Sequence, residues 1–120
     1  MKDFRTLNVW NKAHELTVDL YKLTKSFPKE ETYGLTSQIR RASASVGANI
    51  AEGCGKNSNA DFARYLQIAF GSACELEYHL LLARDLKMVL TEDHHGLESR
   101  LHEVKRMLAS LISKVRSEIA

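Results

Sequence analysis

The sequence predicts an all-α fold, an antiparallel up-down four-helix bundle formed by a single domain over residues 1–120. Six glycines and one proline among 120 residues are too few turn formers for a many-stranded sandwich or barrel. Apolar residues recur at alternating steps of three and four in four segments, which is the period of helices with one buried face. The links between these segments are short, and short links favour antiparallel neighbours.

The first two helices are predicted over residues 7–27 and 33–55. Pro28 closes the first, because the residue before a proline disfavours the helical region. Gly53 and Gly55 stop the second. The predicted core stripes are Val9, Ala13, Leu16, Leu20, Leu23 and Phe27 in the first helix, then Leu35, Ile39, Ala42, Val46, Asn49 and Gly53 in the second.

The last two helices are predicted over residues 59–90 and 92–118. Ser58, with Asp61 three residues later, is an N-cap for the third helix, and Thr91 is one for the fourth. The predicted stripes are Phe62, Leu66, Ala69, Ala73, Leu76, Leu80 and Ala83, then Leu97, Leu101, Val104, Leu108, Leu111 and Val115.

The third and fourth helices carry more apolar residues than one seam requires. The additional residues are Tyr65, Ile68, Leu82, Leu86, Val89, Met107 and Ile112. They indicate burial against another subunit, or else a wide core-facing stripe in a monomer. The two cysteines, Cys54 and Cys74, are expected to be small core residues rather than a disulfide or a metal pair.

A polar row follows one face of the second helix and is matched by polar residues on the third. Because an unpaired buried polar group costs about 1–3 kcal/mol, we expect an inter-helix network. In it Arg40 or Arg41 pairs with Glu75, and Ser45 or Asn49 bonds to Ser72. Such a network could simply fix register and oligomeric state. Its predicted members are Gln38, Ser45, Asn49, Glu52, Ser72 and Glu75.

The charge balance is close to neutral, at +2, with the positive excess in the first half of the chain. Residues 1–60 contain nine Lys and Arg against six Asp and Glu, whereas residues 61–120 contain eight against nine. The residues that could contact nucleic-acid phosphates are Arg40, Arg41, Lys56, Arg64, Lys12 and Lys22. Lysine-rich helices are also commonly just solvated faces.

A metal site has one weak candidate, His95, Glu98 and His102, which share a helical face at steps of three and four. A solvated helix end is the simpler interpretation. The sequence shows no catalytic arrangement of Ser, His and Asp or of Cys and His, so we expect a protein that is not an enzyme and needs no cofactor. No segment is apolar enough to cross a bilayer, and the N-terminus lacks an apolar export region, which predicts a cytoplasmic protein.

Short motifs spread over nearly the whole chain are Leu7-Asn8-Val9-Trp10, Phe27-Pro28, Tyr33-Gly34-Leu35, Gln38-Ile39-Arg40-Arg41-Ala42, Ser45-Val46, Asn49-Ile50-Ala51-Glu52-Gly53, Tyr65-Leu66, Ala69, Gly71-Ser72 and Glu75-Leu76. Together they resemble a bacterial four-helix-bundle family. It includes proteins encoded in intervening sequences of 23S ribosomal RNA genes, often labelled ribosomal proteins. The family is similar to the accessory variability determinant of diversity-generating retroelements.

The resemblance implies a bundle that assembles into a barrel-like homopentamer with a central pore. In the retroelement branch the assembly binds nucleic acid and a reverse transcriptase, so the implied partners are RNA or DNA and that enzyme or another protein. By the same likeness, Arg40 and Arg41 are candidates for an assembly or phosphate contact. We therefore expect a non-catalytic, homo-oligomeric, nucleic-acid-binding accessory protein, with a protein-interaction scaffold that has no nucleic-acid role as the alternative.

Overall fold

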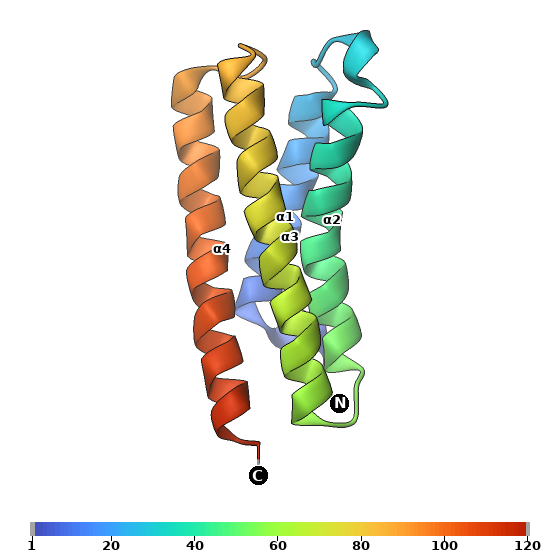
Figure 1. The fold of residues 1–120 in the computed structure, drawn as a ribbon, viewed down its shortest axis with the longest axis vertical. Helices are drawn as coiled ribbons and strands as arrows, with labels where there is room; N and C mark the ends of the chain where they lie inside the picture. The colour runs from blue at the N-terminus through green and yellow to red at the C-terminus, as the bar shows by residue number, and fades with distance from the viewer. Residues whose placement is uncertain (1, 120) are drawn as a thin grey trace.

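Four long helices pack antiparallel in the computed structural model, which describes residues 2–119 (Figure 1). The fold is thus the all-α bundle that the sequence predicts. Its helices are α1 (Asn8–Thr24), α2 (Leu35–Cys54), α3 (Asn59–Asp85) and α4 (Thr91–Ser117). Two short 3-10 turns, η1 (Phe4–Thr6) and η2 (Lys29–Glu31), precede α1 and α2. The molecule measures 49 × 23 × 20 Å, as expected for helices laid side by side.

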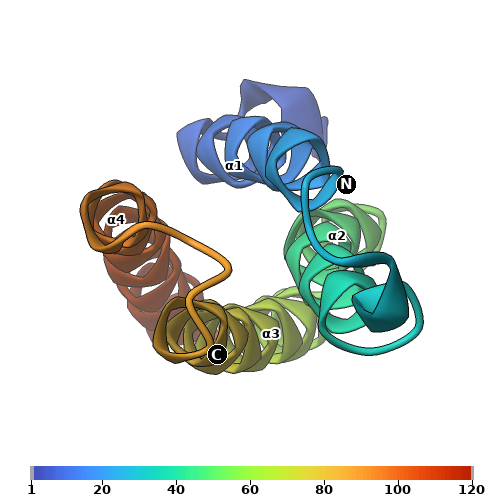
Figure 2. The same ribbon diagram turned by 90° about the horizontal axis from the view of Figure 1, so that it is seen from above.

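The helices form a ring in which each one contacts the two on either side of it. Seen from above, α1, α2, α3 and α4 follow one another around the core (Figure 2). The α2–α3 contact is the most extensive and the α1–α4 contact the least. Because the helices alternate in direction, the start of α1, the end of α2, the start of α3 and the end of α4 share the lower end of the bundle in Figure 1.

The core contains most of the residues of the predicted stripes. At some positions a neighbouring residue of the same helix is buried in place of the predicted one. Leu23, Leu97 and Leu111 lie at the margin of the core, and Asn49 is only partly buried. Ile50 and Ile112 are buried in the core instead. A straight α-helix turns by about 20° per heptad relative to a 3.5-residue repeat, so positions chosen by strict 3–4 spacing shift toward the margin of the core over two or three heptads.

The end of α3 departs from the predicted boundary at residue 90. The helix stops at Asp85 because Lys87 adopts a left-handed backbone with φ 63°. The Met88 amide donates to the Ala83 carbonyl and the Lys87 amide to the Arg84 carbonyl, each at 2.9 Å. This pair of bonds is a Schellman C-cap. The sequence does not signal it because the left-handed residue is a lysine rather than a glycine.

The two predicted N-caps have different outcomes. Ser58 caps α3 as expected, because its hydroxyl accepts a hydrogen bond from the Asp61 amide. Thr91 does not cap α4. It is the first helical residue, and Leu90 is the cap position without a side-chain bond. The Leu90 carbonyl instead accepts the His94 amide at 2.9 Å.

The cysteines and the additional apolar residues divide between core and surface. Cys54 is buried, and burial raises the pKa of its thiol. The prediction is wrong for Cys74, which is exposed on α3. Val89 and Ile112 are buried within the core, whereas Ile68 and Leu86 are exposed. No helix within residues 2–119 is long and apolar enough to cross a membrane.

Close approach of α2 to α3 depends on Gly53. A Cβ atom at this position would lie 2.9 Å from the Tyr65 Cβ and 3.1 Å from the Phe62 Cδ1. Gly71, in the middle of α3, has no atom within 4 Å of the corresponding position. The two glycines therefore differ in the space around them although both lie within helices.

We expect Gly53→Ala to destabilise the protein by about 1–2 kcal/mol, because overpacking outweighs the gain in helix propensity. Gly71→Ala is the matched control and should stabilise it by about 0.5–1 kcal/mol, since only the propensity changes there. Urea denaturation followed by circular dichroism measures both. Equal effects of the two substitutions would contradict the close approach.

Candidate functional site

The end of α4 is a basic stretch of the chain. Residues 104–117 contain four cations and no carboxylate. Lys105 is bound to Glu77, which leaves Arg106, Lys114 and Arg116 exposed on this segment. None of these three takes part in the ion pairs found within residues 2–119.

Antiparallel packing brings two further cations from α3 and its preceding loop to the same end. The Lys56 Nζ lies 5.0 Å and the Arg64 Cζ 4.6 Å from the centre of the Tyr65 ring. Arg64 lines one hollow together with Arg116, so the start of α3 and the end of α4 are adjacent. We call Lys56, Arg64, Arg106, Lys114 and Arg116 the basic end.

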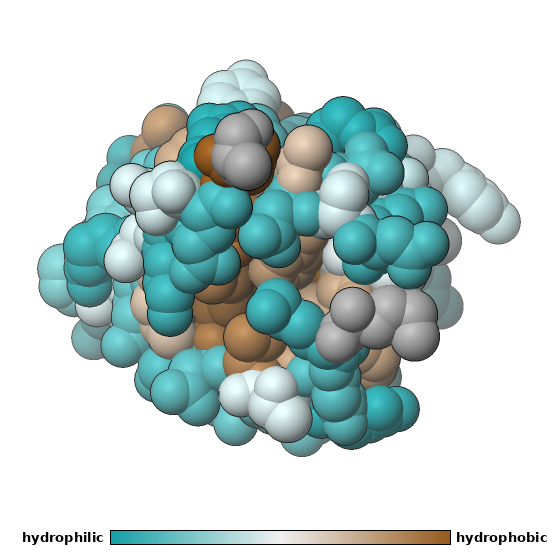
Figure 3. All heavy atoms as spheres, turned by 90° about the horizontal axis from the view of Figure 1, so that it is seen from below, coloured by the Kyte–Doolittle hydropathy of each residue, from teal (hydrophilic) through white to brown (hydrophobic). Residues whose placement is uncertain are grey.

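Figure 3 views the molecule from this end. Hydrophilic side chains surround a central hollow in which hydrophobic side chains remain visible. The residues of the basic end lie at this end of the bundle. Several cations gathered at one end can contact several phosphates at once.

The other predicted phosphate contacts either bond to groups of the protein itself or lie away from the basic end. Arg40 donates from Nε to the Thr24 hydroxyl at 2.8 Å and from Nη2 to the Tyr21 carbonyl at 3.1 Å, which ties α2 to α1. Lys12 pairs with Glu103 at 3.3 Å. Lys22 is exposed at the far end of α1, so it lies away from the basic end.

A polar cluster joins α2 to α3 and brings together most of the predicted network. The Ser45 and Ser72 hydroxyls are hydrogen-bonded at 2.9 Å, and the Asn49 side-chain Nδ2 donates to the Ser45 backbone carbonyl at 2.8 Å. Arg41 pairs with Glu75 and donates to the side-chain Oε1 of Gln38. These contacts match the expected pairings, with Arg41 rather than Arg40 as the partner of Glu75.

Glu52 differs from the predicted membership of this cluster, whereas His79, which follows Ser72 and Glu75 at helical spacing in the sequence, joins it. The His79 Nε2 lies 3.1 Å from the Glu75 carboxylate, one helical turn away. Glu52 lies exposed near the end of α2, outside the contacts that form the cluster. The hydrogen bond from His79, then that from Arg41, holds the pKa of Glu75 below its ordinary value of 4.5.

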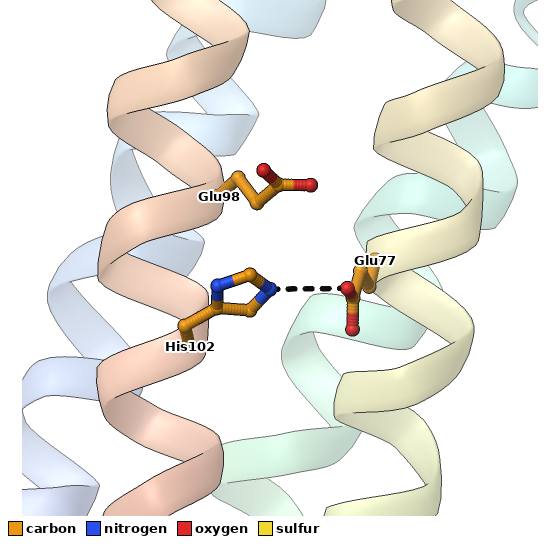
Figure 4. Close-up of side chains that lie close together, drawn as sticks. All are labelled: Glu77, Glu98 and His102. Carbon is orange, nitrogen blue, oxygen red and sulfur yellow. Dashed lines mark hydrogen bonds and ion pairs between the residues drawn. The ribbon is translucent and has the colours of Figure 1, made fainter.

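A second cluster links α3 to α4 and involves two of the predicted metal ligands. His102 Nε2 and Lys105 Nζ lie 3.1 and 2.6 Å from the two carboxylate oxygens of Glu77. These bonds, that of Lys105 first, lower the pKa of Glu77, and its carboxylate raises the pKa of Lys105. Glu98 lies beside them, with its carboxylate within 4.8 Å of the Glu77 and His102 atoms (Figure 4).

His95 does not belong to this cluster, which corrects the predicted set. It is exposed, and Glu77 from α3 takes the third position. Spacing along one helix indicates which residues share a face, but it cannot reveal a ligand contributed by a neighbouring helix.

A groove lies between α1 and α2 on the outside of the bundle, with a volume of about 650 Å³. Its α2 side consists of the small residues Ala44, Gly47, Ala48 and Ala51. On the α1 side Trp10 stacks on His14 with ring centres 4.8 Å apart. These small α2 residues therefore border an open surface as well as packing against other helices.

Comparison with known proteins identifies the family of this chain. Residues 5–110 match the family described as 23S rRNA-intervening sequence protein. The chain belongs to this family. The family resemblance predicted from the short motifs is therefore confirmed.

A solved structure has the same fold as this chain. It is a protein of unknown function from the S23 ribosomal protein family of Bacteroides thetaiotaomicron VPI-5482, with 32% sequence identity and a TM-score of 0.82. The similarity covers 88% of this chain and 95% of that chain. None of the curated proteins compared with the chain is similar to it.

We expect Glu75→Gln to lower the free energy of unfolding at neutral pH by about 0.5–1 kcal/mol, because the neutral amide weakens both charged hydrogen bonds. The pKa of Glu75 is lowered in the folded state. Its contribution is thus complete above the unfolded-state value near 4.5 and is lost as the pH falls through the folded-state value.

Denaturation curves between pH 3 and pH 7 measure this difference, with the exposed Glu52→Gln as the matched control. The wild type and Glu75→Gln should converge at the acid end, while Glu52→Gln should follow the wild type throughout. A constant gap between the wild type and Glu75→Gln at every pH would contradict the assigned role of the carboxylate.

Proposed function

We propose that this family member is a non-catalytic, homo-oligomeric accessory protein that binds RNA or DNA through the basic end. The observation that carries the proposal is the run of α4 from residue 104 to residue 117, which has four cations and no carboxylate. Lys56 and Arg64 lie at the same end of the bundle. Cations attract the phosphate backbone whatever its base sequence, and of the five cations of the basic end only Arg64 has an acidic partner within residues 2–119, Asp61 at 3.7 Å.

The chemistry of the basic end favours phosphate contact over base readout. Its side chains are long, and all but the half-buried Lys56 are exposed. Tyr65, the aromatic ring beneath Lys56 and Arg64, is itself half-buried. Stacking of unpaired bases on that ring is thus limited. We infer binding that depends steeply on salt and weakly on sequence.

The test compares two double variants with the same change in charge. Lys114→Ala/Arg116→Ala removes two cations from the basic end, and Lys29→Ala/Lys87→Ala removes two exposed cations from the opposite end, outside the groove between α1 and α2. Fluorescence anisotropy of a labelled RNA hairpin and a labelled DNA duplex, titrated at several salt concentrations, gives the affinity and its salt slope.

We expect the basic-end variant to bind at least about tenfold more weakly and its salt slope on duplex DNA to fall by up to about 1.8, because each phosphate contact contributes about 0.9. The control variant should bind as the wild type does. Equal losses in both variants would show that total charge alone matters, and unchanged affinity in the basic-end variant would refute the proposal. Circular dichroism checks that both variants fold.

The α1/α2 groove favours a second candidate function, a protein-interaction scaffold. We infer that the occupant is α3 of a second copy of this chain. α3 carries exposed apolar residues, Ile68 at 43% and Tyr78 at 58% exposure. It also has four acids against two arginines, whereas Lys22 and Lys25 line the groove. Small residues on α2 allow another helix to approach closely.

Such a contact joins two different surfaces and generates a ring or an open filament. A closed ring agrees with the barrel-like homopentamer that the family resemblance implies. In this arrangement each protomer presents the groove to one neighbour and the outer face of α3 to the other. The basic ends of all protomers then lie on the same side of the ring, which would combine the self-assembly with the proposed nucleic-acid contact.

Two variants separate the groove from the α3 face. Ala44→Glu/Ala48→Glu places charges in the groove, and Tyr78→Glu places one on α3; all three positions are exposed, so each variant should still fold. We expect each variant alone to be monomeric by light scattering after gel filtration. An equimolar mixture should form dimers and nothing larger, because only one intact interface can then form.

Ser99→Glu, an exposed position on α4 outside the groove, is the control and should keep the mass of the wild-type oligomer. A monomeric wild type would refute the self-assembly. A mixture of the two variants that stays monomeric would show that the groove and the outer face of α3 do not meet.

A further inference from the structure

We propose that Glu77, Glu98 and His102 bind a divalent transition-metal ion that links α3 to α4. The three side chains come from both helices and point into the space between them (Figure 4). One ligand atom from each lies within 4.8 Å of the others. Two carboxylates and one imidazole form a set suited to Zn²⁺ and its first-row neighbours.

The distances require only a small adjustment. Two ligands of one tetrahedral ion with bonds of ~2.1 Å lie ~3.4 Å apart. The His102 Nε2 and the Glu77 Oε2 are 3.1 Å apart, close to that separation. Glu98 is the ligand that must move, and with 35% of its side chain exposed it has the freedom to turn toward the ion.

Lys105 orients the Glu77 carboxylate for this role. Its Nζ lies 2.6 Å from Oε1, which leaves Oε2 directed at His102. The lysine thus occupies the oxygen that the ion does not need, and its positive charge reduces the repulsion between the carboxylates of Glu77 and Glu98. Hydrogen bonds of this kind commonly hold ligating carboxylates in place.

His94 gives an independent indication that a ligand binds beside Glu98. Its side chain is only 4% exposed, and its Nε2 lies 4.0 Å from the Glu98 carboxylate. This buried nitrogen has no hydrogen-bond partner within residues 2–119, which is unfavourable. His94, Glu98 and His102 follow at intervals of four and share one face of α4. When Glu98 turns to the ion with one oxygen, its other oxygen can accept the hydrogen bond from His94.

The test measures Zn²⁺ binding by isothermal titration calorimetry, with the visible absorption of Co²⁺ as a check on the ligand set. We expect one ion per chain and a weakening of at least about tenfold in both His102→Ala and Glu98→Gln. His95→Ala is the matched control, because His95 is an exposed histidine of the same helix outside the cluster, and it should bind as the wild type does.

Thermal unfolding supplies a second readout. Saturating Zn²⁺ should raise the melting temperature of the wild type and of His95→Ala, because an ion that binds the folded state stabilises it, and it should leave His102→Ala unchanged. Absence of binding to the wild type, or binding that survives His102→Ala, would overturn the proposal. Folding of each variant is checked by circular dichroism before titration.

Discussion

The close contact between α2 and α3 is the constraint on which the rest of the structure depends. Gly53 admits Tyr65 and Phe62 near one end of this contact, and the Ser45–Ser72 hydrogen bond lies near its middle. Arg41 and Glu75 pair one turn closer to the start of α2. As residue numbers rise along α2, those of the contacting residues on α3 fall. These contacts therefore fix a single antiparallel register.

That register decides where the charged groups of the other helices meet. With α3 fixed against α2, the short links allow α4 and α1 only one direction each, antiparallel to the helix that each is linked to. The four helices then form a ring with four helix ends at each end of the bundle. The basic end exists because the end of α4 and the start of α3 share one end of the bundle. The cluster of Glu77, Glu98 and His102 exists because α4 runs back along α3. Neither arrangement belongs to a single helix.

The fold could be predicted almost completely from the sequence, because each helix carries its own periodic signal. Contacts within the polar cluster were also predictable, since polar residues inside apolar rows of two helices require partners. Lys87 shows one limit, because a left-handed lysine gives no local signal. Glu77 shows another, because its partners are 25 and 28 residues away on α4.

The basic end shows a different limit to prediction, because charge summed over half of the chain conceals local groups of cations. The positive excess lies in the first half of the chain, because the acids at the start of α4 offset the cations at its end in the sum over the second half. The cations are separate from these acids only over a span of about four helical turns. Position along the helix mattered more than the total charge, because antiparallel packing places opposite ends of consecutive helices together.

The contacts between neighbouring helices differ in extent, and this difference sets the order in which the helices unfold locally. α1 is the shortest of the four helices, and its contact with α4 is the least extensive. It is held to α2 by the Arg40 bonds to Thr24 and Tyr21 and by the Thr17 hydroxyl on the Ser43 carbonyl. Local unfolding begins where contacts are fewest, so α1 should detach as a unit, with backbone amides that exchange with solvent sooner than those of α2 and α3.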